Sequence, residues 1–498
     1  MLPILRRVLI ASSFLLTLGI RLYDLTDPPF DFHATRQFRS AVIARGIYYA
    51  WLPSAPEVQR ARAVQQWNNE RPLEPPIMEG LAALTYHLPG GEALWKARLL
   101  ASVFWEAGGL ALFALTREVT SHRAAWLSSL IYLFLPYGIL ASRSFQPDPL
   151  MVMMTLLALW RVLRWHQRRT WQNAVWAGSL AGIAILIKAV AVFPLGCVVL
   201  GLLFFDADWK QLLRTPQTWM AGVLALGPGA AYYLYGLFIA GFLQGQASQS
   251  FLPHLWFTPD YYLRWAKLAA NVVGGFVILL GGVGIFFWQS KTGRVIALSW
   301  GVGYVVYGLA FPYHIITHDY YHLPLIPLIS FSLAPLVARG IQWLQTRSHF
   351  LQLGLVLLVF GWVSFQLWEA GRELARKNYR SEAEEWRQFQ TIIPPETSVL
   401  AMVQAYGYPL KYYGWTDATL WANQSDLALR ELAGQDPQTL AEKRWAQLEG
   451  MDLFLITNFN ELKRQPELQE YLTTNFGVFA EGEGYIIFDL RTPLESVP

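Results

Sequence analysis

The sequence predicts an α-helical polytopic membrane protein with a small α/β domain at its C-terminal end. Hydrophobic residues make up 54% of the 498 residues and charged residues only 15%, and the mean hydropathy is +0.28, values typical of long apolar spans. The 22 Trp and 23 Tyr residues are typical of aromatic belts at headgroup depth. Charge is also divided: residues 1–368 carry 27 basic and 15 acidic side chains (net +12), whereas residues 369–498 carry 12 basic and 20 acidic (net −8).

The first apolar span, residues 5–22, carries Arg6 and Arg7 at its start, a pattern that signal peptides share with membrane helices. No small-residue cleavage pattern follows it, and residues 21–24 instead read Arg-Leu-Tyr-Asp. We therefore expect a retained membrane helix.

Apolar windows bounded by basic, glycine or proline residues recur along the chain, and they predict about eleven transmembrane helices. The predicted spans are residues 5–22, 94–116, 124–141, 149–164, 172–187, 189–205, 218–240, 268–288, 295–311, 321–338 and 350–368. The stretch 172–205 is read either as two short spans or as one broken hairpin.

Basic residues are distributed unequally between alternate connections. With a cytoplasmic N-terminus, the cytoplasmic connections hold fourteen basic residues and the short outer connections hold four. The positive-inside rule then predicts a multi-pass protein of the cell inner or plasma membrane, with a cytoplasmic N-terminus and an extracytoplasmic C-terminal domain. The basic residues are spread over many loops, which argues against nucleic acid as a partner.

The predicted domains are a transmembrane domain over residues 1–369, whose first outer loop covers 23–93, and an α/β domain over 370–498. In the first outer loop, residues 35–50 and 57–67 predict short amphipathic helices in the membrane interface. The tail alternates strand-like runs with polar helical stretches. Its predicted strands are 398–403, 453–457 and 485–490, and its predicted helices include 381–391 and 436–448.

A polar segment, residues 28–39, directly follows the first span and reads Pro-Pro-Phe-Asp-Phe-His-Ala-Thr-Arg-Gln-Phe-Arg. Its Asp31 lies behind a rigid Pro-Pro turn near the membrane boundary, where partial desolvation would make a carboxylate a stronger general base. The alternative role for Asp31 is an N-cap of the helix that starts at His33–Ala34. Anchoring a helix does not require this mixture of groups, so we interpret the segment, with His33, as part of an active site.

Several other charged residues of the first outer loop are candidates for binding substrate. Arg36, Arg39 and Arg45 recur at roughly helical spacing and could bind a phosphate. Attraction to anionic headgroups is the alternative, and it is the interpretation we favour for Arg45. Glu74, which precedes the second span, is either a substrate-binding residue or an ordinary solvated acid.

Asp148 lies in the shortest outer connection, residues 143–149, between two prolines that fix its direction. It is either the N-cap of the next helix or a second active-site acid on the same face as Asp31, with Arg143 beside it.

Lys188 is a lone charge within an apolar stretch of about 30 residues. A charge at membrane depth is costly unless it snorkels to the surface or meets a partner. Snorkelling is the simple interpretation, and an anionic lipid phosphate is the partner that we favour.

The outer connection of residues 311–324 concentrates histidines and tyrosines in one turn. Its candidate residues for contacts with sugar or phosphate are His314, His318, Asp319, Tyr320 and Tyr321. The spacing matches no closed zinc site, so we expect no cofactor, although a divalent metal ion is the alternative.

These motifs resemble those of the polytopic GT-C glycosyltransferases, in the branch of protein O-mannosyltransferases and the lipid A aminoarabinose transferase. The resemblance covers residues 1 to about 370. It rests on an acid in the first outer loop (Asp31), the motif Pro75-Pro76-Ile77 before the second helix, Asp148 between helices three and four, the later segment Tyr320–Pro327, and the outward C-terminal domain. In many relatives the first-loop acid belongs to an Asp-Glu pair, whereas here Asp31 is followed by Phe32 and His33.

The resemblance implies sugar transfer, with inversion, from a polyprenyl-phosphate donor lipid to a hydroxyl of a glycan, lipid or protein acceptor at the extracytoplasmic face. Asp31 would be the general base, and Asp148 a second acid that orients the acceptor or the donor sugar. Arg143, Lys188 and Arg36 or Arg39 would stabilise the leaving phosphate.

Two other functions are compatible with a polytopic membrane protein. A transporter or flippase of lipid-linked glycans predicts ionisable residues at mid-membrane beside broken, symmetry-related helices, whereas the polar residues here cluster on one face. A structural assembly protein that docks through its acidic tail leaves the outer-face cluster of Asp31, Asp148, Lys188 and His318 without a role.

Overall fold

The computed structural model describes residues 3–205, 209–376 and 378–494. The chain divides into two compact units. The first comprises Met1–Thr26, Pro72–Thr85 and Ala93–Lys377, and the second comprises Asp27–Arg71, Tyr86–Glu92 and Asn378–Pro498. The predicted domain boundary after residue 369 stays a prediction. The first outer loop contributes Asp27–Arg71 to the unit that contains the tail.

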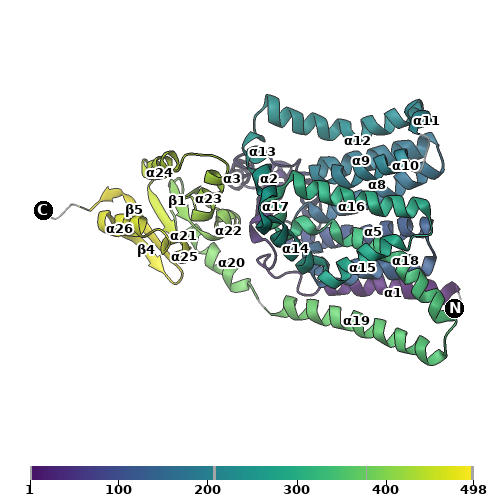
Figure 1. Ribbon diagram of the computed structural model, residues 1–498. Coiled ribbons are helices and arrows are strands. Elements are labelled where there is room, and N and C mark those ends of the chain that lie inside the picture. Colours follow the sequence, from purple (N-terminus) through teal and green to yellow (C-terminus); the bar gives the residue numbers. More distant parts are fainter. Residues whose placement is uncertain (1–2, 206–208, 377, 495–498) are drawn as a thin grey trace. The chain divides into compact units, whose positions relative to one another are not determined.

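The first unit consists of helices (Figure 1). The longer ones are α1 (Pro3–Arg21), α4 (Ile77–Tyr86), α5 (Leu94–Val119), α6 (His122–Phe134), α8 (Asp148–Gln167), α9 (Trp171–Ile187), α10 (Val192–Phe205), α12 (Pro216–Leu234), α14 (Pro259–Val273), α15 (Gly275–Phe286), α16 (Lys291–Ala310), α18 (Leu325–Gln345) and α19 (His349–Ala375). The shorter ones are α7 (Pro136–Ser142), η1 (Ala189–Ala191), α11 (Trp209–Leu213), η2 (Tyr235–Ile239), α13 (Gln244–Ser250), η3 (Pro253–Phe257), α17 (Pro312–Thr317) and η4 (Asp319–His322).

The unit is the helical part of an integral, multi-pass membrane protein. Among the described residues, five helices are long and apolar enough to cross a membrane, or seven if each of two bent pairs forms one span. The bent pairs are α6–α7, broken by 66°, and α14–α15, broken by 92°. Pro136 begins α7 and cannot donate to the preceding turn, and Gly274, at φ 94°, separates α14 from α15. The predicted number of eleven spans stays a prediction.

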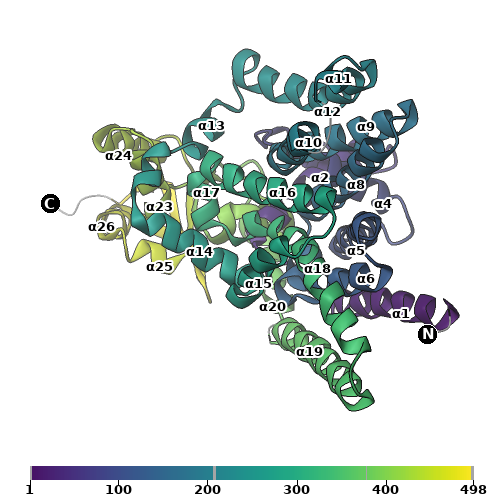
Figure 2. The ribbon, with the colours of Figure 1, turned by 45° about the vertical axis from the view of Figure 1, so that its right-hand side comes forward.

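Small residues bring the helices of the first unit close together. Figure 2 shows α8, α9 and α10 as neighbouring helices, and α9 also packs against α12. A Cβ atom added to Gly178 would lie 2.6 Å from the Ala221 carbonyl oxygen, and one added to Gly182 would overlap the Leu224 carbonyl oxygen. Glycine at these positions therefore permits the close α9–α12 contact, as is usual between membrane helices.

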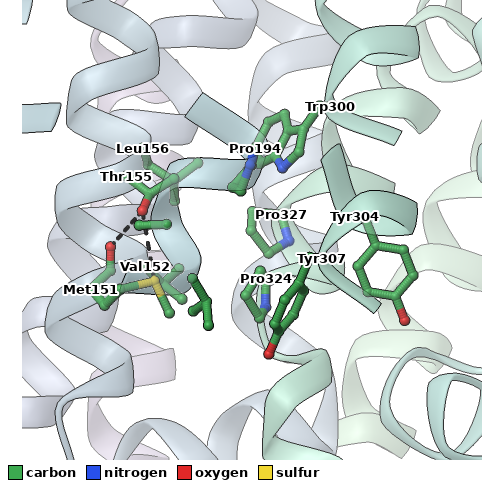
Figure 3. A pocket seen from close by; sticks show the side chains of 12 residues that line it. Met151, Val152, Thr155, Leu156, Pro194, Trp300, Tyr304, Tyr307, Pro324 and Pro327 are labelled. Atoms are coloured by element: carbon green, nitrogen blue, oxygen red, sulfur yellow. Dashed lines mark hydrogen bonds between the residues drawn. The ribbon is translucent and has the colours of Figure 1, made fainter. Parts of the chain in front are cut away.

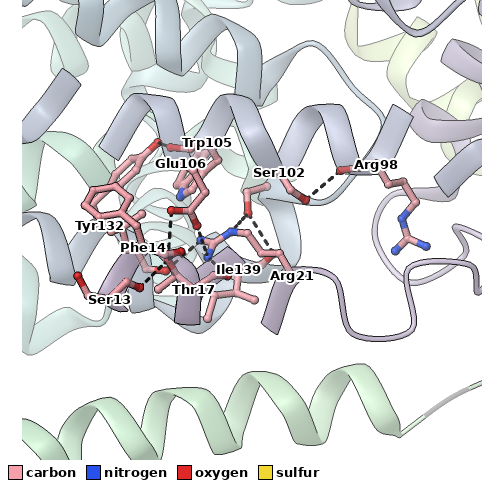
Figure 4. A network of polar contacts seen from close by, with 12 residues as sticks. Ser13, Phe14, Thr17, Arg21, Arg98, Ser102, Trp105, Glu106, Tyr132 and Ile139 are labelled. Carbon is pink, nitrogen blue, oxygen red and sulfur yellow. Dashed lines mark hydrogen bonds and ion pairs between the residues drawn. The ribbon is translucent and has the colours of Figure 1, made fainter. Parts of the chain in front are cut away.

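A buried ion pair connects α1 to α5, and the same arginine also bonds to the bent pair α6–α7 (Figure 4). Arg21 Nη1 lies 3.2 Å from Glu106 Oε1, and Thr17 donates to the other Glu106 oxygen at 3.1 Å. Arg21 also donates to the carbonyl oxygen of Leu133, at the end of α6, and to the hydroxyl of Ser142, at the end of α7. One guanidinium thus links both halves of a broken helix to the first helix, so each half is held in place despite the break.

We expect Glu106→Leu to destabilise the first unit by about 3–5 kcal/mol, because it leaves the buried Arg21 guanidinium without its counter-charge. The double variant Arg21→Met/Glu106→Leu should recover most of this loss. Thermal unfolding of the detergent-solubilised full chain checks both values. Equal stability of the Glu106→Leu variant and the wild type would show that the pair does not hold these helices together.

The second unit contains a five-stranded sheet of order β2-β1-β3-β5-β4. Its strands are β1 (Val399–Met402), β2 (Thr419–Leu420), β3 (Leu453–Ile456), β4 (Phe476–Gly482) and β5 (Tyr485–Pro493). β1 runs parallel to β2 and β3, with Val399 opposite Leu453, whereas β5 runs antiparallel to β3 and β4. The three predicted strands are confirmed as β1, β3 and β5.

The helices of the second unit come from both parts of the chain. They are α2 (Ala34–Ala50), α3 (Glu57–Asn68), α20 (Arg380–Arg387), α21 (Phe389–Ile392), η5 (Gln404–Gly407), α22 (Tyr408–Tyr413), α23 (Gln424–Leu432), α24 (Pro437–Trp445), η6 (Ala446–Leu448), α25 (Phe459–Leu462) and α26 (Pro466–Asn475). The predicted helices at 35–50 and 57–67 are confirmed as α2 and α3. However, α2 is largely buried because it packs against α3 and α22, so it is not amphipathic.

Arg45 of α2 has a structural role in the second unit. Its side chain is buried and donates to Gln66 Oε1 at 2.7 Å and to the carbonyl oxygens of Tyr412 and Lys411 at 2.6 and 2.9 Å. Its guanidinium lies 3.9 Å from the ring centre of Trp415. The expectation that Arg45 attracts headgroups is wrong, because a buried and hydrogen-bonded guanidinium cannot reach a lipid surface.

Candidate active site

The first unit holds a buried ion pair between Asp148 and Lys188. The Lys188 ammonium lies 2.8 Å from Asp148 Oδ1, and the two side chains are 6% and 2% exposed. Asp148 opens α8, where the helix dipole favours a carboxylate. Lys188 ends α9 at a break in extended conformation before η1. The break turns the ammonium inward, so snorkelling of Lys188 to the surface is wrong.

Asp148 does not cap α8, because Pro147 is the N-cap residue and no side chain caps this helix. One Asp148 oxygen, Oδ2, is buried and has no hydrogen-bond partner among the described residues. Both amide atoms of the fully buried Gln146 also lack a partner there. Buried polar groups without partners are uncommon and costly, so this turn offers unused donors and acceptors beside a charged pair.

Gln146 is a candidate that the sequence analysis missed. The sequence places it in the same proline-bracketed turn as Asp148, but a neutral amide gives no electrostatic signal, and its burial appears only in the structure. Its position makes it a candidate for contact with substrate.

We expect Gln146→Met to leave the free energy of unfolding equal to that of the wild type or higher, because it removes two buried polar groups without partners. If the amide binds substrate, the same change should raise the KM for that substrate about tenfold, through loss of a buried hydrogen bond. Thermal unfolding and steady-state turnover check the two expectations. A stable variant with an unchanged KM would limit Gln146 to a packing role.

Aromatic residues of the predicted histidine and tyrosine turn surround the Lys188 ammonium. It lies 5.1 and 4.8 Å from the ring centres of Tyr320 and Tyr321. The Tyr137 hydroxyl interacts electrostatically with Asp319 and Asp148. These contacts place Tyr320, Tyr321 and Asp319 near the ion pair.

Two of the three histidines of this turn, His314 and His318, contact the ring of Tyr321. The His314 ring contacts the Tyr321 ring edge-on, with centroids 5.0 Å apart, and His314 Nε2 lies 3.4 Å from Ser250 Oγ. The His318 ring lies 5.9 Å from the same tyrosine ring. No group of three His, Cys, Asp or Glu side chains arranged to hold a metal ion occurs among the described residues.

Figure 3 shows a narrow apolar pocket, lined in part by residues of α8 that follow Asp148 and residues of η1 that follow Lys188. Its walls come from α8, η1, α10, α16 and the turn that opens α18, and its lining residues are Met151, Val152, Thr155, Leu156, Val190, Ala191, Pro194, Trp300, Tyr304, Tyr307, Pro324 and Pro327. Thr155 donates to the Met151 carbonyl oxygen of its own helix, and the Tyr304 hydroxyl lies 2.6 Å from His322 Nδ1. These two hydroxyl groups therefore already have hydrogen-bond partners, and the pocket presents a mainly apolar surface. This surface begins at Met151, one helical turn from Asp148.

Arginine residues fix the backbone of the adjoining outer turns. Arg143 donates to the carbonyl oxygens of Tyr23 and Asp24 at 2.7 and 3.1 Å. Arg98 donates to the carbonyl oxygens of Arg143 and Leu25. These bonds connect the end of α1 to the turn that carries Gln146 and Asp148. In this structure Arg143 positions that turn, and its predicted contact with a phosphate stays a prediction.

Asp31, in the second unit, is exposed and does not cap a helix. His33 is the N-cap residue of α2, in the left-handed conformation (φ 45°), and no side chain caps this helix. Gln37 donates to Asp31 Oδ1 at 3.3 Å and to the Phe32 carbonyl oxygen at 2.6 Å. The capping alternative for Asp31 is wrong in this structure, because His33 is the N-cap residue and no side chain caps α2. The partial desolvation of Asp31 at a membrane boundary stays a prediction.

Arg39 belongs to a cluster around Glu70 in the second unit. Arg39 Nε lies 3.7 Å from Glu70 Oε2, and Lys411 Nζ lies 2.7 Å from Glu70 Oε1. Burial, followed by the Glu70 carboxylate, raises the pKa of Tyr408, so its hydroxyl stays protonated and donates to Glu70 at 2.8 Å. Arg36 also interacts electrostatically with Tyr408.

Glu74 lies in the first unit, where it interacts electrostatically with Tyr233.

Comparison with known proteins agrees with the helical architecture. The family described as "Dolichyl-phosphate-mannose-protein mannosyltransferase" matches residues 73–233, which include Asp148 and Lys188. ArnT from Cupriavidus metallidurans in its apo state is similar in structure, with 17% identity over 97% of both chains and a TM-score of 0.59. The structure of the same protein bound to undecaprenyl phosphate has a TM-score of 0.61 with this chain.

The oligosaccharyltransferase AglB from Archaeoglobus fulgidus, in complex with an inhibitory peptide and a dolichol-phosphate, has a TM-score of 0.58 and 12% identity over 99% of this chain and 76% of that chain. No curated protein is detectably similar in sequence. The solved structures show that the chain has the GT-C fold. Together with the family match they indicate a GT-C glycosyltransferase, a polytopic membrane enzyme.

Proposed function

We propose that this chain transfers a sugar from a polyprenyl-phosphate carrier to a hydroxyl acceptor at the extracytoplasmic face, with inversion at the anomeric carbon. The observation that carries the proposal is the buried Asp148–Lys188 pair, which is followed along the chain by residues that line an apolar pocket, Met151 in α8 and Val190 in η1. A long apolar chain joined to a phosphate has the matching chemistry. The likeness to an ArnT structure that holds undecaprenyl phosphate supports the same class of donor.

In the reaction, the acceptor oxygen attacks the anomeric carbon from the face opposite the phosphate. A bond forms between this oxygen and the anomeric carbon, while the bond from that carbon to the phosphate oxygen breaks. The acceptor proton passes to Asp31, and the carrier leaves as polyprenyl phosphate. The leaving group carries its own negative charge, so it requires cationic stabilisation more than an added proton.

Lys188 is the proposed source of this stabilisation, with Arg143 and Arg36 or Arg39 as further candidates. One donor of the Lys188 ammonium is directed at Asp148, and an ammonium has two more. Asp148 orients that ammonium, and the unpartnered Asp148 Oδ2 and Gln146 amide can bind hydroxyls of the donor sugar. Tyr320 and Tyr321 provide flat surfaces and hydroxyl groups beside it.

A cleft in the second unit suits an acceptor. It is lined by fifteen residues, among which Phe30 and Ala34 flank Asp31 and three acids, Glu382, Glu385 and Glu483, provide hydrogen-bond acceptors. Such a surface suits an acceptor rich in hydroxyl groups.

The test is turnover by the full chain in liposomes, with a panel of polyprenyl-phosphate sugars and release of polyprenyl phosphate as the readout. Turnover that requires both a lipid-linked sugar and a hydroxyl acceptor supports the proposal. Movement of lipid-linked sugar between leaflets without release of polyprenyl phosphate would instead support a flippase and overturn the transferase.

A further inference from the structure

The second unit contains a second pocket, apart from the cleft beside Asp31. It lies at the carboxyl ends of the parallel strands β1 and β2, between α23 and α24, and has a volume of about 180 Å³. Ligands of open α/β sheets commonly bind at the carboxyl ends of parallel strands.

The walls of this pocket are basic, although the surrounding chain is acidic. They include Arg430, Lys443 and Arg444 but only one acid, Asp426. Residues 369–498 as a whole carry 20 acidic and 12 basic side chains. Three of these 12 basic side chains, a quarter, therefore line this one pocket. The Tyr406 hydroxyl also donates to Asp426 Oδ1 at 2.6 Å, which engages the only carboxylate among the lining residues.

Three polar atoms in the pocket wall are buried and have no hydrogen-bond partner among the described residues. They are Arg444 Nε, Asn423 Oδ1 and Gln447 Oε1. The guanidinium nitrogen is a donor and the two amide oxygens are acceptors. A bare inorganic anion would satisfy the donor but would leave the amide oxygens unpaired. A ligand with both an anionic group and hydroxyl groups would satisfy all three.

The backbone holds an aromatic ring at the pocket. Ala405 and Tyr406 adopt φ values of 48° and 54°, and Gly407 follows at 69°. The left-handed conformation is unfavourable for residues other than glycine, and such strain clusters at binding sites. The Tyr406 side chain is 45% exposed and offers a flat apolar face.

We propose that this pocket binds an anionic saccharide, a sugar that carries a carboxylate or a phosphate group. Arg430, Lys443 and Arg444 bind the anionic group, Asn423 and Gln447 accept from sugar hydroxyls, and Tyr406 packs against the ring. The site is independent of the sugar donor and of Asp31, so its test does not depend on the transferase proposal.

The test is saturation-transfer difference NMR on the detergent-solubilised full chain with three probes: glucuronic acid, glucose 6-phosphate and glucose. We expect at least one charged sugar to bind about tenfold or more tightly than glucose, because charge-assisted hydrogen bonds are the stronger class. The two charged probes separate a carboxylate ligand from a phosphate ligand. Equal binding of all three sugars overturns the proposal, as does inorganic phosphate that competes as strongly as glucose 6-phosphate.

Arg444→Gln and Arg430→Gln should each weaken binding of the charged sugar about tenfold. Arg430 is exposed, so its replacement keeps the test valid if Arg444→Gln does not fold. The matched control is Lys463→Gln, which removes one positive charge from an exposed position outside the pocket. Equal loss of affinity in the control would show long-range attraction by net charge and would overturn the assignment of this pocket.

Discussion

The Asp31→Asn variant is expected to lose turnover by about 10²- to 10⁴-fold, the usual contribution of a general base. Asparagine keeps the size of the side chain and can still accept from Gln37, which donates to Asp31 Oδ1 at 3.3 Å. It cannot take up the proton of the acceptor hydroxyl. The measurement is release of polyprenyl phosphate in liposomes at saturating donor, with donor binding measured separately and expected to be unchanged.

The matched control for this change is Glu57→Gln, which removes the same charge from an exposed position of the same loop. It should turn over at the wild-type rate. If Asp31→Asn also kept the wild-type rate while folded, Asp31 would not be the base, and Asp148 would become the candidate. A loss of donor binding in Asp31→Asn would instead give Asp31 a role in holding the donor.

Local patterns predicted the elements of the fold well. The strands at 399–402 and 453–456 are short apolar runs that are buried throughout, and these strands, the strand at 485–493 and the helices α2 and α3 can be recognised from short stretches of sequence. The division of the chain into two units does not follow from local patterns, because it depends on contacts between segments that are distant in the sequence. Arg45, for example, donates to the carbonyl oxygen of Tyr412, 367 residues away, and its spacing alone resembled that of a headgroup-binding arginine.

The sequence indicated candidate side chains one by one, but it did not predict how they are arranged in space. Lys188 stood out as a lone charge in an apolar stretch and Asp148 as an acid between two prolines, yet nothing in a separation of 40 residues shows that they pair. Arg143 stood out through its charge, although its guanidinium is directed at the backbone of residues 23 and 24. Gln146 gave no signal, because an amide reveals its importance only through burial without a partner.

Variants of the Asp148–Lys188 pair are expected to have large effects both on the free energy of unfolding and on turnover. Lys188→Met leaves a buried carboxylate without its counter-charge, which should cost about 3–5 kcal/mol of unfolding free energy. The double variant Asp148→Leu/Lys188→Met replaces both charges with apolar groups of similar volume, and it should recover most of that stability. Thermal unfolding of the detergent-solubilised full chain measures both.

The double variant distinguishes a structural role of the pair from a role in the reaction, because it restores packing without restoring the two charges. If Lys188 stabilises the leaving phosphate, the double variant should stay as inactive as Lys188→Met although it is stable. A stable double variant with wild-type turnover would reduce the pair to a structural contact. The control is Glu118→Gln, which breaks the 3.0 Å contact with Arg164. That pair is partly exposed, with side chains 17% and 30% accessible, so its loss should cost less than about 1 kcal/mol and leave turnover unchanged.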